Sequence, residues 1–207
     1  MLNEPAISYA RRMGTGLRER RREKARRTIQ ECALDLFDER GFDAVTIEEI
    51  AAAAEVSPSS VYRYFGTKEG LLVADEFDTM SEAALADLLD LDDPVGSLVR
   101  IVRRYEETPD GAPRSEPGPW RRIRYFFQQP SVRMAACATL DRAGRRIAVT
   151  MAGHGRLTET QARVAANALV FGYFAALEQW YLDGGERPIA EYVEEGLAPL
   201  RPIWSPA

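Results

Sequence analysis

The sequence predicts an all-α fold, in which three small N-terminal helices precede a larger helical bundle. Apolar residues recur at helical spacing from the first helix onward, as Ile29, Ala33 and Phe37 do. Residues that start and stop helices separate the periodic segments, and no alternating pattern of the length of a strand is present. With 207 residues, 45% of them apolar, the chain is long enough to bury a sizeable core.

The first predicted helix runs from Arg20 to Arg40, after a segment, 1–19, that we expect to be a mobile arm. Gly41 is typical of the residue after a helix end. Thr46 and Glu49 form a capping box for a helix ending near Glu55. Further helices are expected at the ranges 58–65 and 67–89, and then, within the bundle, at 95–107, 120–128, 130–153, 157–183 and 188–200. Prolines and glycines mark 108–120 as a loop.

The predicted domains are a flexible basic arm (1–19), a helix-turn-helix domain (20–66) and a helical domain (67–207) to which the helix 67–89 is the connector. The net charge of the chain is −5, which by itself argues against a nucleic-acid partner. Residues 1–34, however, carry nine Arg and Lys against four Glu, a net of +5. This asymmetry indicates either a basic patch on an acidic body or a solvated basic tail without a partner.

Cysteine and histidine usage argues against metal or redox chemistry. Cys32 and Cys137 are far apart, and Cys32 lies in an apolar helical pattern, which favours a small buried side chain. His154 is the single histidine, so no zinc cluster is expected. No nucleophile–base constellation and no glycine-rich phosphate loop occurs, so we expect neither an enzyme nor a cofactor.

No apolar run approaches the roughly 18 residues that a membrane span needs. The first residues also lack the apolar stretch of a signal peptide. We therefore expect a cytoplasmic protein with no membrane partner. Met1 and Met13 both remain possible as the true start of the chain.

The order of a helix, a short turn and a two-turn helix is that of a helix-turn-helix, which docks its second helix in the major groove of DNA. That second helix begins with small polar residues, Ser57-Pro58-Ser59-Ser60. Val61 and Phe65, four residues apart, are expected to anchor it to the core. Tyr62 and Arg63 then face outward, where such side chains contact phosphates and bases.

Helix starts in this region provide further candidate phosphate contacts. Thr46 and Thr67 precede helices whose free N–H groups attract anions, and Lys68 adds an ammonium at the second start. Taken alone, both threonines are equally consistent with simple caps and Tyr64 with a core residue. The candidate DNA-binding residues are Thr46, Ser57, Ser59, Ser60, Tyr62, Arg63, Tyr64 and Lys68.

Residues 41–72, GFDAVTIEEIAAAAEVSPSSVYRYFGTKEGLL, closely resemble the DNA-binding domain of TetR-family regulators. The resemblance extends back through the first helix and covers about residues 20–78. It implies that the side chains aligned with Ser59, Ser60, Tyr62, Tyr64 and Lys68 contact DNA. Pro58-Ser59-Ser60 departs from relatives that carry a basic residue or glycine there, which leaves the operator sequence open. Arg18 to Arg27 is similar to arms that reach phosphates or the minor groove in some members.

The resemblance also implies a C-terminal domain that binds a small-molecule effector and forms a homodimer on a pseudo-palindromic, double-stranded DNA operator. Residues 165–182 are too apolar all round for a surface helix, so one face is expected to meet a partner. The candidate dimerisation residues are Phe171, Leu177, Trp180 and Tyr181. Residues 177–185 also look like the acyl-CoA-responsive type of this domain.

Aromatic and apolar residues of the bundle are candidates for the effector cavity, although ordinary core packing explains each of them as well. They are Tyr105, Trp120, Arg124, Phe127, Met134 and Phe174. Arg124 lies among aromatic neighbours and is the candidate partner of an anionic group. The sequence thus predicts a ligand-responsive DNA-binding regulator, with a repressor expected from the family. The alternatives are a small all-α enzyme or carrier and an adaptor that no longer reads DNA.

Overall fold

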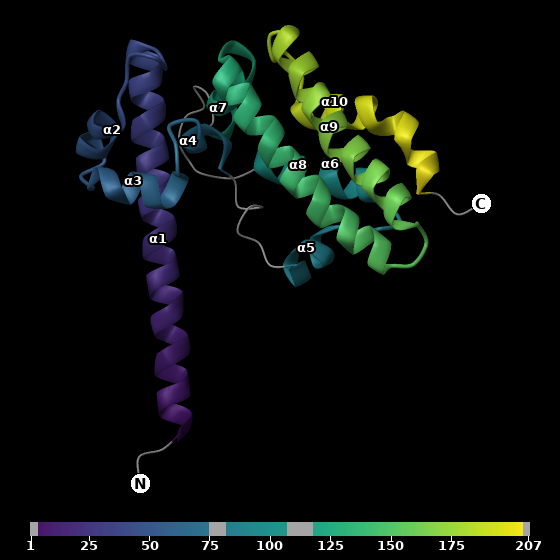
Figure 1. The fold of residues 1–207 in the computed structure, drawn as a ribbon, viewed down its shortest axis with the longest axis horizontal. Coiled ribbons are helices and arrows are strands. Elements are labelled where there is room, and N and C mark those ends of the chain that lie inside the picture. Colours follow the sequence, from purple (N-terminus) through teal and green to yellow (C-terminus); the bar gives the residue numbers. More distant parts are fainter. Residues whose placement is uncertain (1–3, 75–81, 107–117, 205–207) are drawn as a thin grey trace. The chain divides into compact units, whose positions relative to one another are not determined.

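The computed structural model describes the backbone of residues 4–74, 82–106 and 118–204, and the side chains of most residues from 21 onward. In these ranges the regular structure is entirely helical, which confirms the all-α prediction (Figure 1). The chain divides into two compact units, Met1–Leu72 and Val73–Ala207. The division lies inside the predicted connector helix 67–89. None of the helices in the described ranges is long and apolar enough to cross a membrane.

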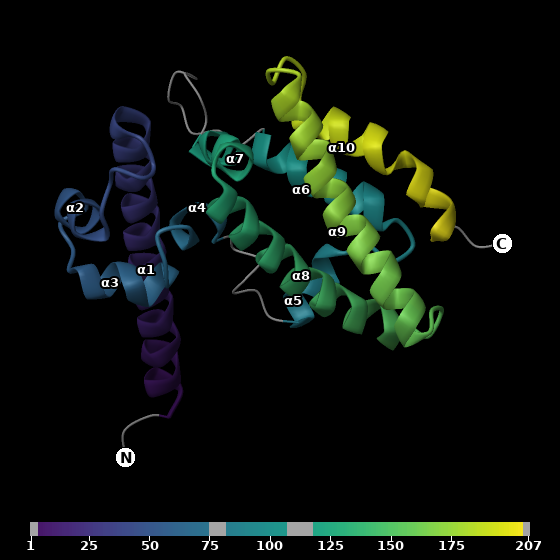
Figure 2. The same cartoon turned by 45° about the horizontal axis from the view of Figure 1, so that its top comes forward.

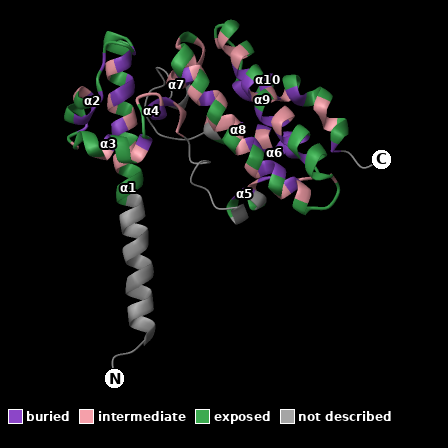
Figure 3. Ribbon diagram, in the orientation of Figure 1, coloured by how far each residue is buried: buried purple, intermediate pink, exposed green. Residues whose placement is uncertain are grey.

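The N-terminal unit consists of α1 (Glu4–Arg40), α2 (Ile47–Ala53), α3 (Pro58–Phe65) and the start of α4 (Gly70–Val73). α2 and α3 lie beside the C-terminal half of α1, which carries buried residues toward them (Figures 1 and 3). Its core is formed by residues from all four helices and the α1–α2 loop, among them Ile29, Phe37, Val45, Ile50, Val61 and Leu71.

Gly41 ends α1 because its φ of +85° lies in the left-handed region that glycine adopts at little cost. Its N–H donates to the Phe37 carbonyl at 2.9 Å. The chain then turns so that Phe42 packs on Phe37, with ring centroids 5.0 Å apart. Phe42 and Val45 are both buried, so the α1–α2 loop is part of the core.

The predicted start of the first helix was wrong, because α1 begins at Glu4 and not near Arg20. Segment 1–19, predicted to be a mobile arm, is therefore helical from residue 4. Pro5 lies in the first turn, where its missing N–H would have no intrahelical partner in any case. Gly14 and Gly16 each weaken a helix by about 1 kcal/mol but remove no hydrogen bond, so they do not end it.

The predicted continuous helix 67–89 is also corrected. Thr67 caps as expected, since its Oγ1 accepts from Gly70 N at 3.0 Å, but α4 ends at Val73 and Ala74 is not helical. Gln30 Nε2 of α1 donates to the Leu71 carbonyl at 3.0 Å, the acceptor that the next turn would use. The next described helix is α5 (Glu82–Leu88).

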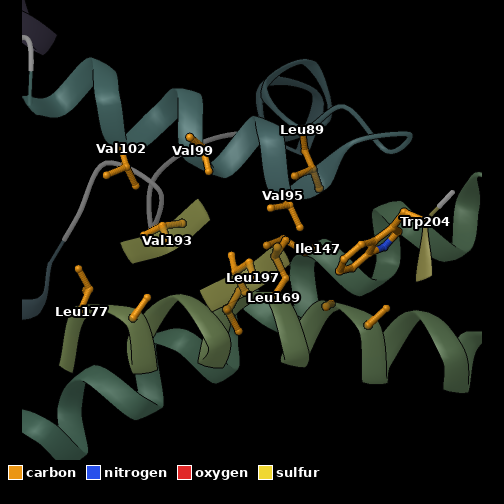
Figure 4. Packing of buried hydrophobic residues seen from close by; sticks show 14 of the residues in the cluster. Leu89, Val95, Val99, Val102, Ile147, Leu169, Leu177, Val193, Leu197 and Trp204 are labelled. Atoms are coloured by element: carbon orange, nitrogen blue, oxygen red, sulfur yellow. The ribbon is translucent and has the colours of Figure 1, made fainter. Parts of the chain in front are cut away.

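The C-terminal unit continues with α6 (Pro94–Glu106), α7 (Gly118–Gln128), α8 (Pro130–Gly153), α9 (Glu159–Leu182), α10 (Ile189–Leu197) and a 3-10 turn, η2 (Ala198–Ile203). These helices match the predicted ranges to within a few residues. α8 and α9 form an antiparallel pair, and α9 lies between α8 and α10 (Figure 2). The centre is filled by α6, α9, α10 and Trp204, as Figure 4 shows for Val95, Leu169 and Leu197.

Replacing Gly70 with alanine should destabilise the N-terminal unit. A Cβ at Gly70 would lie 1.9 Å from the Phe65 carbonyl oxygen, a backbone atom at the end of α3 that has no room to move. We expect a loss of about 1–3 kcal/mol, measured as a lower urea midpoint by circular dichroism.

Gly153→Ala is the matched control, because a Cβ there meets nothing within 4 Å. Its stability should be unchanged or raised by up to about 1 kcal/mol. Equal urea midpoints for Gly70→Ala and wild type would show that this close approach is not a constraint.

Candidate functional site

The start of α2 is fixed by a complete capping box. Thr46 Oγ1 accepts from Glu49 N at 3.2 Å, and Thr46 N donates to Glu49 Oε2 at 2.8 Å. Arg40 Nη2 of α1 donates to the other carboxylate oxygen at 2.7 Å. These interactions, the Thr46 backbone N–H first, lower the pKa of Glu49 to about 2. Thr46 is therefore a cap, whatever else it contacts.

The turn between α2 and α3 contains a strained residue. Glu55 has a φ of +54°, the one positive value at a non-glycine residue among the described positions. Such a conformation costs a side-chain-bearing residue about 1 kcal/mol or more. Val56 N donates to Ala51 O at 2.9 Å across this turn. The turn directs the chain from α2 into α3.

α3 begins with a cluster of serine hydroxyls. Ser57 is the N-cap, and its Oγ accepts from Ser60 N at 3.3 Å. The same Oγ lies 2.9 Å from the hydroxyls of Ser59 and Ser60. Pro58 occupies the first turn, as the sequence predicted. These hydroxyls lie at the helix end that carries free N–H groups, and Ser57 and Ser59 are exposed.

The two faces of α3 are those that the sequence predicted. Val61 is fully buried and Phe65 is 9% exposed, which confirms them as the face that holds α3 to its unit. Tyr62 is 50% exposed and Arg63 is exposed, so both face outward. Arg63 Nη2 donates to Ser60 Oγ at 3.2 Å, and its guanidinium lies 5.0 Å from the Tyr64 ring centroid. Tyr64 is half-buried.

Lys68 has a structural role that the sequence did not predict. Its Nζ donates to the carbonyl oxygens of Phe42 and Val45, at 2.8 and 3.0 Å, and lies 4.3 Å from the Phe42 ring centroid. The ammonium thus joins the residues after α3 to the α1–α2 loop. Because an ammonium has three N–H groups, one remains for another acceptor.

Basic side chains of α1 are exposed beside this motif. Arg21, Arg22, Lys24 and Arg27 are exposed. Arg26 is half-buried, with its guanidinium 5.2 Å from the Phe65 ring centroid. The described part of the basic segment is therefore helical and adjoins the C-terminal end of α3.

In the C-terminal unit, the structure brings together only some of the predicted effector-site residues. Phe127 and Phe174 pack with ring centroids 5.2 Å apart. Arg124 lies instead over the ring of its neighbour Tyr125, at 5.2 Å. The side chains of Tyr105 and Trp120 lie outside the described residues. Met134 is 73% exposed, so its prediction as a cavity residue is wrong for this chain. It lies on the outer side of α8.

Arg133 is the arginine that lies among these aromatic rings, and the sequence reasoning missed it. Its guanidinium lies 5.5 Å from the Phe127 centroid and 5.3 Å from the Phe174 centroid. Nη1 and Nη2 donate to the two oxygens of Glu178 at 2.7 and 3.0 Å. This pairing raises the pKa of Arg133 and lowers that of Glu178. One sequence signal could have pointed to a partner for an arginine here: Phe174 and Glu178 are four residues apart, which puts a ring and a carboxylate on one helix face.

The predicted dimerisation residues divide between core and surface. Leu177 is 2% exposed and belongs to the core, so its prediction as an interface residue is corrected. Trp180 donates from Nε1 to the Arg187 carbonyl at 3.1 Å and Tyr181 stacks on Phe127, so both make contacts within the chain. Phe171 is 39% exposed. It shares an outward, apolar stripe of α9 with Val164, Ala168, Ala175 and Leu182.

In the described part of the chain, no group of three or more His, Cys, Asp or Glu side chains is placed to hold a metal ion. Cys32 is half-buried, and its Sγ lies 3.6 Å from the Ala53 carbonyl. Burial is the main cause of a raised pKa for this thiol. Cys137 is also half-buried, and neither cysteine forms a disulfide.

Residues 29–74 are similar to a known family of proteins. The model described as "Bacterial regulatory proteins, tetR family" matches this range. Over 79 residues the chain is 39% identical to the HTH-type transcriptional repressor BdcR of Escherichia coli K12, covering 35% of this chain and 40% of that protein. Over 107 residues it is 36% identical to the HTH-type transcriptional repressor Rv3405c of Mycobacterium tuberculosis H37Rv, covering 51% and 52%. The chain thus spans about half the length of these relatives, or less.

Solved structures resemble more of the chain. Native NalD, the secondary repressor of the MexAB-OprM multidrug efflux pump in Pseudomonas aeruginosa, superimposes with a TM-score of 0.52 at 20% identity, over 86% of this chain and 95% of that one. The fatty acid degradation regulator FadR from Bacillus halodurans gives 0.51 at 14% identity, over 86% and 93%. At these identities the likeness shows the fold alone.

Stability in acid should depend on Glu49. Its pKa falls from 4.5 in the unfolded chain to about 2 in the folded one. The ionised carboxylate therefore stabilises the fold above pH 4.5, and this contribution is lost as the pH falls to about 2. Glu49→Gln should lower the stability of the N-terminal unit at neutral pH and flatten its decline over that window, as measured by urea unfolding at each pH.

Glu48→Gln is the control, because it removes a charge from the same helix turn without changing the capping box. If the free energies of unfolding of wild type and Glu49→Gln change with pH in parallel, Glu49 does not cause the loss of stability in acid.

Proposed function

We propose that this chain is a member of the TetR family of bacterial regulatory proteins, whose model matches residues 29–74, and that it is a DNA-binding transcriptional regulator rather than an enzyme. The observation that carries the proposal is α3: Val61 and Phe65 hold it, while Ser59, Tyr62 and Arg63 face outward. An eight-residue helix held in this way fits the major groove with its N-terminal residues toward the bases.

The proposed DNA contacts fall into two groups. Ser57, Ser59, Ser60 and Arg63 lie on the first two turns of α3 and are proposed to meet base edges or adjacent phosphates. Their hydroxyls bond to each other in the free protein, so contact with DNA exchanges one set of hydrogen bonds for another. Within the described part of the chain, the contacts of Arg63 are a serine hydroxyl and a ring, and phosphate or base acceptors of DNA can replace them at little cost.

The second group is proposed to contact phosphates and so to fix the orientation of the domain on the duplex. It comprises Thr46 at the start of α2, Tyr62, Tyr64 and Lys68. Lys68 is proposed as a phosphate contact because its ammonium has three N–H groups and the carbonyls of Phe42 and Val45 accept from two of them. The exposed Arg21, Arg22, Lys24 and Arg27 of α1 add a basic surface to the same unit.

Two copies of the chain are proposed to bind one pseudo-palindromic operator. A two-fold dimer presents two α3 helices to two half-sites, so the half-site spacing mirrors the dimer geometry. The apolar stripe of α9 supports this proposal, since Phe171 and Leu182 are large side chains exposed on a helix whose opposite face is buried in the core. A small apolar or amphipathic effector bound in the C-terminal unit would change the α3 separation and release the DNA, as in a repressor.

Operator binding should weaken when Arg63 is replaced with alanine. A base or phosphate contact of an arginine is worth about 1–3 kcal/mol, so we expect a loss of roughly five-fold to a hundred-fold. The measurement is a band shift with DNA from upstream of the gene that encodes this chain, repeated over a series of salt concentrations. Wild-type affinity should fall steeply with salt, because Arg and Lys release counterions from phosphates.

Arg103→Ala, at an exposed position of α6, is the matched control and should leave the affinity unchanged. If no upstream fragment is retained, with or without candidate ligands, the proposal fails and an adaptor role is favoured instead.

The dimer should dissociate when Phe171 is replaced with glutamate, because the substitution puts a charge in an apolar contact. Sedimentation velocity should report a monomer for Phe171→Glu and a dimer for wild type. Phe171→Leu keeps an apolar side chain and should remain dimeric. A wild-type chain that sediments as a monomer at micromolar concentration would exclude the proposed assembly.

A further inference from the structure

Arg133 lies in a side-chain cluster formed by three helices at one end of the bundle. Phe126 and Phe127 belong to the C-terminal end of α7, Arg133 to the first turn of α8, and Phe174, Glu178 and Tyr181 to α9. The Phe127 and Tyr181 rings stack at 5.4 Å, and Phe174 lies 6.4 Å from Phe126.

The guanidinium of Arg133 is held on several sides. Two rings flank it, at 5.5 and 5.3 Å, and a carboxylate accepts from its two terminal nitrogens in the bidentate geometry typical of Arg–carboxylate pairs. The side chain is nevertheless 41% exposed, so its outer edge is accessible to solutes. Arginine is the residue that suits such recognition, since its donors form a rigid planar fork.

Glu178 is held much less firmly than its partner. Arg133 is the hydrogen-bonding partner that the structure gives it among the described residues, and its side chain is 37% exposed. If another carboxylate took its place, Glu178 would rotate into water, while Arg133 would keep both rings and both hydrogen bonds. The carboxylate is therefore the exchangeable member of the pair.

We propose that Arg133 is the anchor for an organic carboxylate with an apolar body, and that Glu178 occupies the position of the ligand carboxylate in the free protein. Phe127 and Tyr181, which are both half-buried, provide the apolar surface for the body of the ligand, with the buried Phe174 ring behind them. This inference rests on the proposed function, because the organic carboxylate is the proposed chemical class of the regulator's effector. It also moves the predicted anion partner from Arg124 to Arg133.

Replacement of Glu178 by a ligand carboxylate would also change the contact between α8 and α9. Arg133 and Glu178 join the start of α8 to the last part of α9. A ligand that replaces Glu178 breaks this link between the two helices and leaves its own contacts on α8. Because the apolar stripe of α9 includes Ala175 and Leu182, on either side of Glu178, the break occurs beside the proposed dimer surface.

The test measures binding of two matched probes to the full-length chain by isothermal titration calorimetry: 4-phenylbutyrate, an anion, and 4-phenylbutylammonium, a cation. Wild type should bind the anion and not the cation. Glu178→Gln removes the internal competitor and should tighten 4-phenylbutyrate binding about two- to fivefold, the scale of an exposed ion pair. Arg133→Gln should weaken it about tenfold or more. Arg133→Lys should fall between wild type and Arg133→Gln.

Arg103→Gln controls for the loss of a positive charge elsewhere, and circular dichroism with thermal unfolding checks that each variant is folded. The proposal is overturned if Glu178→Gln weakens anion binding, if the cation binds and Arg133→Gln tightens it, or if neither wild type nor Glu178→Gln binds 4-phenylbutyrate.

A band shift on the same preparations separates this inference from the function on which it rests. If the ligand pattern holds and no DNA is bound, the carboxylate site stands while the regulatory proposal fails. If DNA is bound and the ligand pattern is absent, the regulatory proposal stands and this site is wrong.

Discussion

The burial of Val61 and Phe65 is the contact on which the N-terminal unit depends. α3 has eight residues, fewer than the roughly 12–15 that an isolated helix needs to be even marginally stable in water. Its helical form therefore comes from the two side chains that it buries and from the serine cap at its start. Other contacts converge on the same point: Arg26 lies over the Phe65 ring and Gly70 passes beside the Phe65 carbonyl.

Local signals predicted this part of the chain well because they act within one helical turn. The capping box of Thr46, the Ser57-Pro58 start and the Gly41 end all depend on residues within about one helical turn of each other. The spacing of Val61 and Phe65 predicted which side chains face outward, and the family resemblance added which of them are expected to contact DNA. What local signals missed depends on partners far along the chain: Gln30 donates to the Leu71 carbonyl of α4 from 41 residues away, and Lys68 reaches back to Phe42.

In the C-terminal unit, the sequence predicted the ranges of the helices well but the residues of the effector site less well. Helix ranges follow from periodicity, whereas the neighbours of a side chain follow from how helices pack. Arg124 has aromatic neighbours in the sequence and Arg133 has none, yet the packing of α7, α8 and α9 puts Arg133 between two rings and leaves Arg124 over Tyr125. Leu177 was misassigned for the same reason, since an apolar residue on an apolar helix gives no sign of which neighbour it meets.

The left-handed conformation of Glu55 couples the unfolding of α2 to that of α3. A turn of this kind is unfavourable for a glutamate by itself, so it persists only while the helices on both sides are docked on α1. If either helix separates, the turn relaxes, and the geometry that directs the other is lost with it. The two helices should therefore melt as a single cooperative unit, and the motif should populate few states in which it is half formed.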